Sequence, residues 1–218
     1  GFVQLYGMTE TCGAVTYLPA DDHRAGGPRL RSAGKAVPGA EIRIMDPEAD
    51  RVLGPNVVGE ICIRSPTTMR GYWKQEAETA RTITAGGWVR TGDAGLMDED
   101  GYVFISDRVK DMIVSGGENV YPAEVENAMY GHPDIAEVAV IGVPDPKWGE
   151  AVKAVVVPKA GITPDPAAIL DFTRQRIAGY KVPKSVDFVD ALPRNGTGKV
   201  LKRDLRAPYW DGRDRQVN

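Results

Sequence analysis

The sequence contains little of what several common classes of functional site require. Two cysteines, Cys12 and Cys62, and two histidines, His23 and His132, occur among its 218 residues. Two cysteines cannot make a disulfide framework, and both have small or apolar neighbours, so we expect free, buried thiols in a reducing compartment. Neither histidine has the context of a metal site or of a Ser-His-Asp triad, and we expect neither kind of centre.

Charge and apolar runs are equally limited. A net charge of −3 gives no bulk attraction to nucleic acid or to an anionic membrane. No apolar run approaches the ~20 residues that a membrane-spanning helix needs. We therefore expect a cytoplasmic protein, at most peripherally associated with a membrane, and no nucleic-acid partner. The sequence starts at Gly1, with neither an initiator methionine nor a signal-peptide pattern, so we also expect a piece of a longer chain.

The first half of the sequence carries mainly β patterns. Glu41–Asp46 and Gly59–Arg64 alternate as half-buried strands do, and Phe2–Leu5 is typical of a short buried strand. A hairpin-turn signal precedes the strand pattern Tyr102–Ile105. Glu76–Thr82 is the one short helix expected in this half.

The pattern changes after Asn119. Pro122 suits a helix start and Gly131 a helix end. Further helices are expected at residues 165–179 and 202–206, and strands at residues 135–141, 152–157 and 186–189. We therefore predict an α/β to α+β protein with two domains, residues 1–109 and 110–218. The second should have a three-stranded sheet with flanking helices.

The glycine-rich loop before the last helix does not match the common phosphate-binding motifs. A P-loop needs glycine where Pro193 stands and serine or threonine where Val200 stands. A dinucleotide fingerprint starting at Gly196 fails because Leu201 occupies the position of its last glycine.

Four separated segments together resemble the adenylate-forming superfamily, and within it the acyl-CoA synthetases. They are Tyr6-Gly7-Met8-Thr9-Glu10, Arg90-Thr91-Gly92-Asp93, the stretch from Arg108 to Glu126, and Pro193-Arg194-Asn195-Gly196-Thr197-Gly198-Lys199. The resemblance covers nearly the whole chain. It implies that residues 1–109 are the C-terminal part of a large AMP-binding domain, including a distorted β-barrel subdomain. Residues 110–218 would be its mobile small domain. The family's phosphate loop would precede Gly1, in an N-terminal part of the same protein.

The resemblance implies a nucleotide site in the first domain. Thr9 would bind phosphate, and Glu10 would hold Mg²⁺, since a bare carboxylate would repel the phosphates of ATP. Tyr6 would lie against the adenine, with Gly7 beside it. Asp93 would accept hydrogen bonds from the ribose diol.

The resemblance also assigns roles at and after the domain boundary. Arg108 would make a second ribose contact, and Lys110 would be the hinge about which the small domain rotates. Lys199 would reach the carboxylate and the α-phosphate during adenylation. Gly116 and Gly117 would line the pantetheine tunnel of CoA, and Trp148 is read as an interface or pantetheine-side residue.

Each of these residues also has an ordinary structural reading, such as a turn glycine, a capping aspartate or a solvated lysine. The leading functional prediction is an acyl-CoA synthetase that uses ATP, Mg²⁺ and CoA to activate a carboxylic acid, which we expect to be a fatty acid. One alternative keeps adenylation but passes the acyl group to a carrier protein or another acceptor. Another is a piece of protein that only binds nucleotide or packs against a partner.

Overall fold

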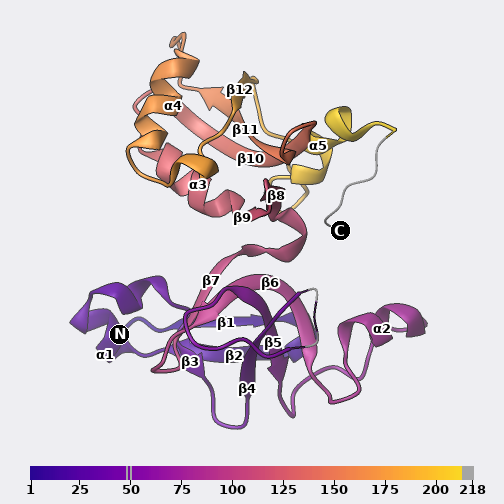
Figure 1. The fold of residues 1–218 in the computed structure, drawn as a ribbon. Coiled ribbons are helices and arrows are strands. Elements are labelled where there is room, and N and C mark those ends of the chain that lie inside the picture. The colour runs from indigo at the N-terminus through magenta and orange to yellow at the C-terminus, as the bar shows by residue number, and fades with distance from the viewer. Residues whose placement is uncertain (48, 50, 213–218) are drawn as a thin grey trace. The chain divides into compact units, whose positions relative to one another are not determined.

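The computed structural model describes residues 1–47, 49 and 51–212. The chain divides into two compact units, Gly1–Val109 and Lys110–Asn218. Each unit has its own sheet structure and its own apolar core (Figure 1). Within the described ranges, no helix is long and apolar enough to cross a membrane.

Two antiparallel sheets build the described part of the first unit. One has the strand order β1-β2-β3 and the other β4-β5-β6-β7. The strands are β1 (Gln4–Met8), β2 (Gly13–Leu18), β3 (Lys35–Ala36), β4 (Glu41–Met45), β5 (Gly59–Arg64), β6 (Val89–Met97) and β7 (Val103–Arg108). The helical segments are η1 (Thr9–Thr11), α1 (Ala20–Ala25), η2 (Pro28–Arg31) and α2 (Glu76–Thr82).

The core of the first unit lies between these two sheets. Val15 of β2 packs in one cluster with Ile44 of β4, Ile61 and Ile63 of β5 and Val103 of β7. The alternation of apolar and polar residues along β4 and β5 directs the isoleucines to this side. In the described residues the sheets do not close on themselves, so the expected distorted barrel is present as two packed sheets.

The predicted buried strand at the start of the chain is wrong. The exposed fractions of Phe2, Val3 and Leu5 are 68%, 48% and 61%, and β1 begins only at Gln4. β1 is the edge strand of its sheet, so among the described residues it pairs with β2 on one side only. The alternation of side chains along β1 directs Tyr6, and not Leu5, toward the core. The helical segments α1 and η2, together with β2 and β3, were not predicted.

The second unit is built on a larger sheet than the sequence suggested. Its described residues form five strands rather than three, in the order β10-β11-β8-β9 with β12 beside β11. The strands are β8 (Ile113–Ser115), β9 (Glu118–Val120), β10 (Ile135–Asp145), β11 (Gly149–Pro158) and β12 (Ser185–Phe188). The two unpredicted strands, β8 and β9, form a hairpin within the stretch that resembles the family's hinge region.

Helices cover both faces of this sheet (Figure 1). They are α3 (Pro122–Tyr130), α4 (Pro166–Arg174) and α5 (Lys202–Trp210). Two short helical segments, η3 (Val109–Asp111) before β8 and η4 (Gly179–Lys181) after α4, complete the order. Val140 of β10 and Val152 of β11 pack with α3 and α4, whereas the neighbouring Ile141 and Ala151 share a cluster with Leu205 of α5. Consecutive strand residues therefore serve opposite faces, which explains why both strands read as nearly continuous apolar runs.

The β8–β9 hairpin turns on two glycines in the left-handed region. Gly116 has φ 63° and Gly117 has φ 84°, and Ser115 pairs with Glu118 across them. Two positive φ angles in a two-residue loop are typical of a type I′ turn. The two glycines differ in their surroundings. The Gly116 N–H donates to the Trp148 carbonyl at 2.8 Å, and a Cβ on Gly116 would stand 2.7 Å from the Trp148 ring.

This difference predicts that Gly116→Ala destabilises the protein more than Gly117→Ala. Both alanines would cost about 1–2 kcal/mol for the left-handed conformation. Only the first adds overpacking against Trp148, roughly 1–3 kcal/mol, because a Cβ on Gly117 meets no atom of the described chain within 4 Å. Urea unfolding of the two variants measures the difference. Equal midpoints would contradict the close approach of Trp148 to Gly116.

Candidate functional site

The turn after β1 presents Thr9 and Glu10. Thr11, fully buried, locks this turn, because its hydroxyl accepts the Met8 N–H at 3.1 Å and donates to the Gly13 carbonyl at 2.9 Å. Thr9 is exposed and Glu10 is partly buried. Gly7 permits the tight return of the chain, since a Cβ there would lie 2.0 Å from the Gly13 carbonyl oxygen.

The Glu10 carboxylate is held by a neutral donor. The Tyr72 hydroxyl donates to Glu10 Oε1 at 2.8 Å, and the Met69 N–H donates to the Glu10 carbonyl at 2.8 Å. The hydrogen bond to Glu10, followed by burial, raises the pKa of Tyr72, so this phenol remains a donor at neutral pH. Among the described residues, no lysine, arginine or histidine forms an ion pair with Glu10. Its negative charge is therefore not compensated.

Asp93 has the opposite surroundings. Its side chain is only 12% exposed and accepts from Arg108 Nη1 at 2.6 Å on one oxygen. The other oxygen accepts from the Tyr6 hydroxyl at 2.7 Å. These contacts fix the carboxylate and compensate its charge, while each oxygen keeps a second lone pair for further donors. This arrangement suits a neutral hydroxyl ligand better than a cation.

A β-bulge aims Asp93. Arg90 pairs with Cys62 and Ala94 pairs with Glu60, so three residues of β6 stand opposite Ile61 alone. Gly92 takes φ 69° within this bulge. The buried Glu60 carboxylate stabilises it by accepting the Gly92 N–H at 3.1 Å and pairing with Arg90 at 3.0 Å. Bulges of this kind redirect a side chain.

Strand pairing brings the three groups around Asp93 together. Asp93 and Arg108 are direct partners in the register of β6 and β7. Tyr6 comes from β1 in the other sheet, where it packs against the shared core. Burial, and next the negative charge of Asp93, raise the pKa of Tyr6 well above the ordinary value of about 10. Tyr6 therefore contacts Asp93 through its hydroxyl; its predicted contact with adenine stays a prediction.

Lys199 lies on a short, ordered loop of the second unit. The Asn195 side-chain oxygen accepts the Thr197 N–H at 3.0 Å and the Lys199 N–H at 2.9 Å, and Gly198 has φ 84°. Arg194 and Val200 close the loop as a β-bridge. Lys199 is exposed, and its ammonium pairs with no carboxylate of the described chain. The loop therefore fixes the backbone and leaves the side chain able to reach an anion.

The remaining predicted residues lie at the start of the second unit, apart from Trp148, which lies between β10 and β11. Lys110 is the middle residue of η3. The next residue, Asp111, pairs with Arg206 of α5 at 2.8 Å. Trp148 covers Gly116, is 41% exposed, and carries the Lys147 ammonium 4.5 Å from its ring centroid. The structure thus brings Gly116, Gly117 and Trp148 together at one end of the sheet.

A dedicated protein cage for a metal is absent from the described residues, which contain no cluster of three potential ligands. The uncompensated carboxylate of Glu10 fits Mg²⁺ bound in another way. Magnesium commonly takes one or two carboxylates, with substrate phosphates and water completing its octahedron. Asp93 fits a cation poorly because Arg108 already pairs with it.

Comparison with known proteins identifies the family. A family model described as "AMP-binding enzyme" matches residues 1–73, and one described as "AMP-binding enzyme C-terminal domain" matches residues 124–199. The chain belongs to the AMP-binding enzyme family. The resemblance carried by the four sequence segments is thereby confirmed.

Relatives within the AMP-binding family are ligases by name. A fatty acid–[acyl-carrier-protein] ligase, ScoC of Streptomyces coeruleorubidus, is 46% identical over all of this chain and 41% of its own length. An indoleacetate–CoA ligase of Aromatoleum aromaticum is 48% identical over 94% of this chain and 39% of its own. The chain thus spans about two fifths of the length of these curated relatives.

Solved structures of the AMP-binding family superpose well. ATP-bound MatB of Rhodopseudomonas palustris matches with a TM-score of 0.84 and 42% identity, over 95% of this chain and 40% of that one. The o-succinylbenzoate CoA synthetase MenE of Bacillus subtilis, in complex with its acyl-adenylate, matches with a TM-score of 0.84 and 36% identity. That match covers 99% of this chain and 42% of MenE.

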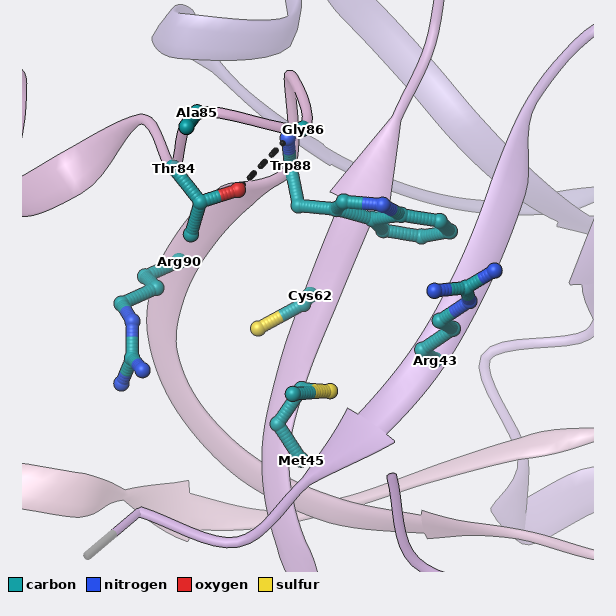
Figure 2. A pocket seen from close by; sticks show the side chains of 8 residues that line it. All are labelled: Arg43, Met45, Cys62, Thr84, Ala85, Gly86, Trp88 and Arg90. Atoms are coloured by element: carbon teal, nitrogen blue, oxygen red, sulfur yellow. Dashed lines mark hydrogen bonds between the residues drawn. The ribbon is translucent and has the colours of Figure 1, made fainter. Parts of the chain in front are cut away.

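A separate cavity of about 310 Å³ lies in the first unit, on the face of the β4-β5-β6-β7 sheet that points away from the core (Figure 2). A cross-strand row of Arg43, Cys62 and Arg90 crosses its floor. Arg43 stacks on Trp88 at 4.2 Å, and Arg90 is paired with Glu60, so both cations are already engaged.

The two cysteines differ in burial. Cys62 is buried as expected, whereas Cys12 is exposed, in the left-handed turn after η1.

Sequence reasoning missed the residues that support this candidate site. Tyr72 contacts Glu10 itself. Glu60 bonds the backbone of Gly92, next to Asp93, and Thr11 bonds Met8 and Gly13 on either side of the Thr9–Glu10 turn. Tyr72 is 62 positions from Glu10. The local sequence pattern does not predict such contacts, because each depends on how separate strands and turns pack.

Spectrophotometric titration should detect the environment of Tyr6. In wild type its phenol should ionise at higher pH than exposed tyrosines, because burial and Asp93 both disfavour the phenolate. Asp93→Asn should lower the pKa of Tyr6 by removing the nearby charge, yet leave it above about 10, since burial persists. The difference between each protein and its Tyr6→Phe counterpart isolates this signal. Ionisation of Tyr6 together with the exposed tyrosines would contradict the assignment.

Proposed function

We propose that the complete protein carrying this chain is an AMP-forming acyl-CoA synthetase. It would activate a carboxylic acid with ATP to an acyl-AMP and then transfer the acyl group to the thiol of CoA. The observation that carries the proposal is the pair of contrasting carboxylates, Glu10 without a cationic partner and Asp93 fixed by Tyr6 and Arg108. The ligase names of relatives that match 94–100% of this chain support the same reaction class.

The two carboxylates would divide the recognition of ATP. Asp93 offers charge-assisted acceptors to the ribose diol, and the exposed part of Arg108 offers donors to the same sugar. Thr9 would donate its exposed hydroxyl to a phosphate oxygen. Mg²⁺ held at Glu10 would supply positive charge that offsets the phosphates. Gly7 would support this set by keeping the turn close to β2.

Lys199 would promote the first half-reaction. A carboxylate oxygen of the acid attacks the α-phosphorus of ATP, the bond to the bridging oxygen breaks, and pyrophosphate leaves. Both reactants are anionic, so an ammonium beside the attacking carboxylate and the α-phosphate lowers the barrier. The exposed side chain of Lys199 on its ordered loop is suited to this role.

The second half-reaction would involve the start of the second unit. The thiolate of CoA attacks the acyl carbon, the carbon–oxygen bond to AMP breaks, and AMP leaves. Gly116 and Gly117 form a narrow backbone turn beside Trp148, which suits contact with a slender pantetheine arm. Lys110 would act as the hinge between the two half-reactions.

A second candidate transfers the acyl group elsewhere. The ScoC relative is named as a ligase for an acyl-carrier protein, whereas the MenE neighbour is named as a CoA synthetase. Release of AMP by the complete protein, measured with a panel of fatty and aryl acids plus either CoA or a carrier protein, separates the two acceptors. A fatty-acid substrate and a cytoplasmic location remain predictions.

Lys199→Ala in the complete protein should reduce acyl-AMP formation by about 100- to 1000-fold, the usual loss when one group that stabilises transition-state charge is removed. Thioester formation from supplied acyl-AMP should stay within about twofold of wild type. Lys202→Ala, three residues further on, is the nearby control. An equal loss of both half-reactions would contradict this division of labour.

Lys110→Pro should have the opposite effect. Proline fixes φ near −65°, which restricts the rotation that the hinge must allow. Acyl-AMP formation should persist, while transfer to CoA from bound acyl-AMP should fall by at least about tenfold. Single-turnover measurements of each step test this. Normal CoA transfer in the variant would remove Lys110 from the mechanism.

A further inference from the structure

A clamp made by residues 69–79 holds Glu10 from two sides. The Met69 N–H fixes the Glu10 main chain, and the Tyr72 hydroxyl fixes carboxylate oxygen Oε1, both at 2.8 Å. Glu10 therefore has little freedom to rotate, and its second oxygen, Oε2, carries no partner among the contacts of the described chain. A carboxylate presented in this way offers one oriented oxygen to a cation.

Helix α2 in turn fixes the clamp. The Tyr72 N–H donates to Thr79 Oγ1 at 2.9 Å, and Thr79 also donates to the Gln75 carbonyl at 2.9 Å. Gly71 lies so close to Thr79 that a Cβ on it would stand 2.7 Å from Thr79 Cγ2. Helix α2 thus positions the phenol through the main chain of Tyr72.

We propose that Tyr72 is a positioning residue for divalent-cation binding by Glu10. It orients the carboxylate through Oε1 and leaves Oε2 for the Mg²⁺ that accompanies ATP. A neutral donor suits this task better than a lysine or arginine would, because it orients the oxygen without cancelling the charge that attracts the metal. The proposal rests on the proposed function of Glu10.

A purely structural tie between η1 and the segment before α2 is the competing explanation. It predicts that loss of the phenol hydroxyl lowers stability and leaves the response to Mg²⁺ unchanged. A positioning role predicts a change in the Mg²⁺ response itself. The two are separated by measuring ATP binding at rising Mg²⁺, without carboxylic acid or CoA, so that no turnover occurs.

Tyr72→Phe, made in the complete protein, keeps the ring and removes the donor. By calorimetry, the Mg²⁺ concentration that half-maximally tightens ATP binding should rise about tenfold, since a hydrogen bond to a charged group is lost. ATP affinity without Mg²⁺ should be unchanged. Tyr102→Phe is the matched control, because Tyr102 also donates to a carboxylate, that of Asp22, at 2.9 Å. It should leave the Mg²⁺ response unaltered.

Two further variants make each outcome decisive. Glu10→Gln should abolish the tightening by Mg²⁺; if it does so while Tyr72→Phe behaves as wild type, the positioning role is overturned and the proposed function survives. A normal Mg²⁺ response in Glu10→Gln would instead overturn the metal assignment itself. If Tyr72→Phe does not fold, Thr79→Val, which releases the Tyr72 N–H, should shift the Mg²⁺ requirement in the same direction by a smaller factor; an unshifted requirement there would overturn the positioning role.

Discussion

The carboxylate of Asp93 is the constraint on which the first unit's site depends. It lies almost buried, and an isolated buried charge costs several kcal/mol or more unless it is paired and hydrogen-bonded. Arg108 from the neighbouring strand and Tyr6 from the other sheet supply those partners. Because the partners come from two sheets, satisfying this one charge also fixes how β1 lies over β6 and β7. The bulge at Gly92 is the local deformation that makes the meeting possible.

Charge compensation, rather than residue type, separates the two acidic residues of the site. Asp93 and Glu10 are both carboxylates that accept from a tyrosine hydroxyl, at 2.7 Å and 2.8 Å. Only Asp93 also has an arginine. A compensated carboxylate retains directional acceptors but attracts cations weakly, whereas an uncompensated one keeps its full attraction. The same local chemistry therefore supports sugar recognition at one residue and metal binding at the other.

The sequence predicted the parts of the fold that have strong periodicity or clear caps. Strands β4 and β5 follow from alternation, and β10 and β11 from their apolar runs. Helices α3 and α4 follow from Pro122 and from Asp165, whose carboxylate does cap α4 by accepting the Ala167 N–H. The short strands β8 and β9 were not predicted, because three residues are too few to show an alternation of apolar and polar side chains. The edge strand β1 was misplaced because its apolar side chains are exposed, which composition alone cannot reveal.

Site residues were found by resemblance, and the structure adds physical reasons that sometimes compete with the functional ones. Gly116 and Gly117 are a case in point, since both are required by a type I′ turn and Gly116 also by the Trp148 ring. The hairpin they close is anchored to the sheet by the buried Glu150, which accepts the Val114 N–H at 3.3 Å. Their glycine identity is therefore explained without any ligand. Tyr72 is the contrasting case, because a phenylalanine would fill the same space, so that its hydroxyl is explained by the bond to Glu10 and not by packing.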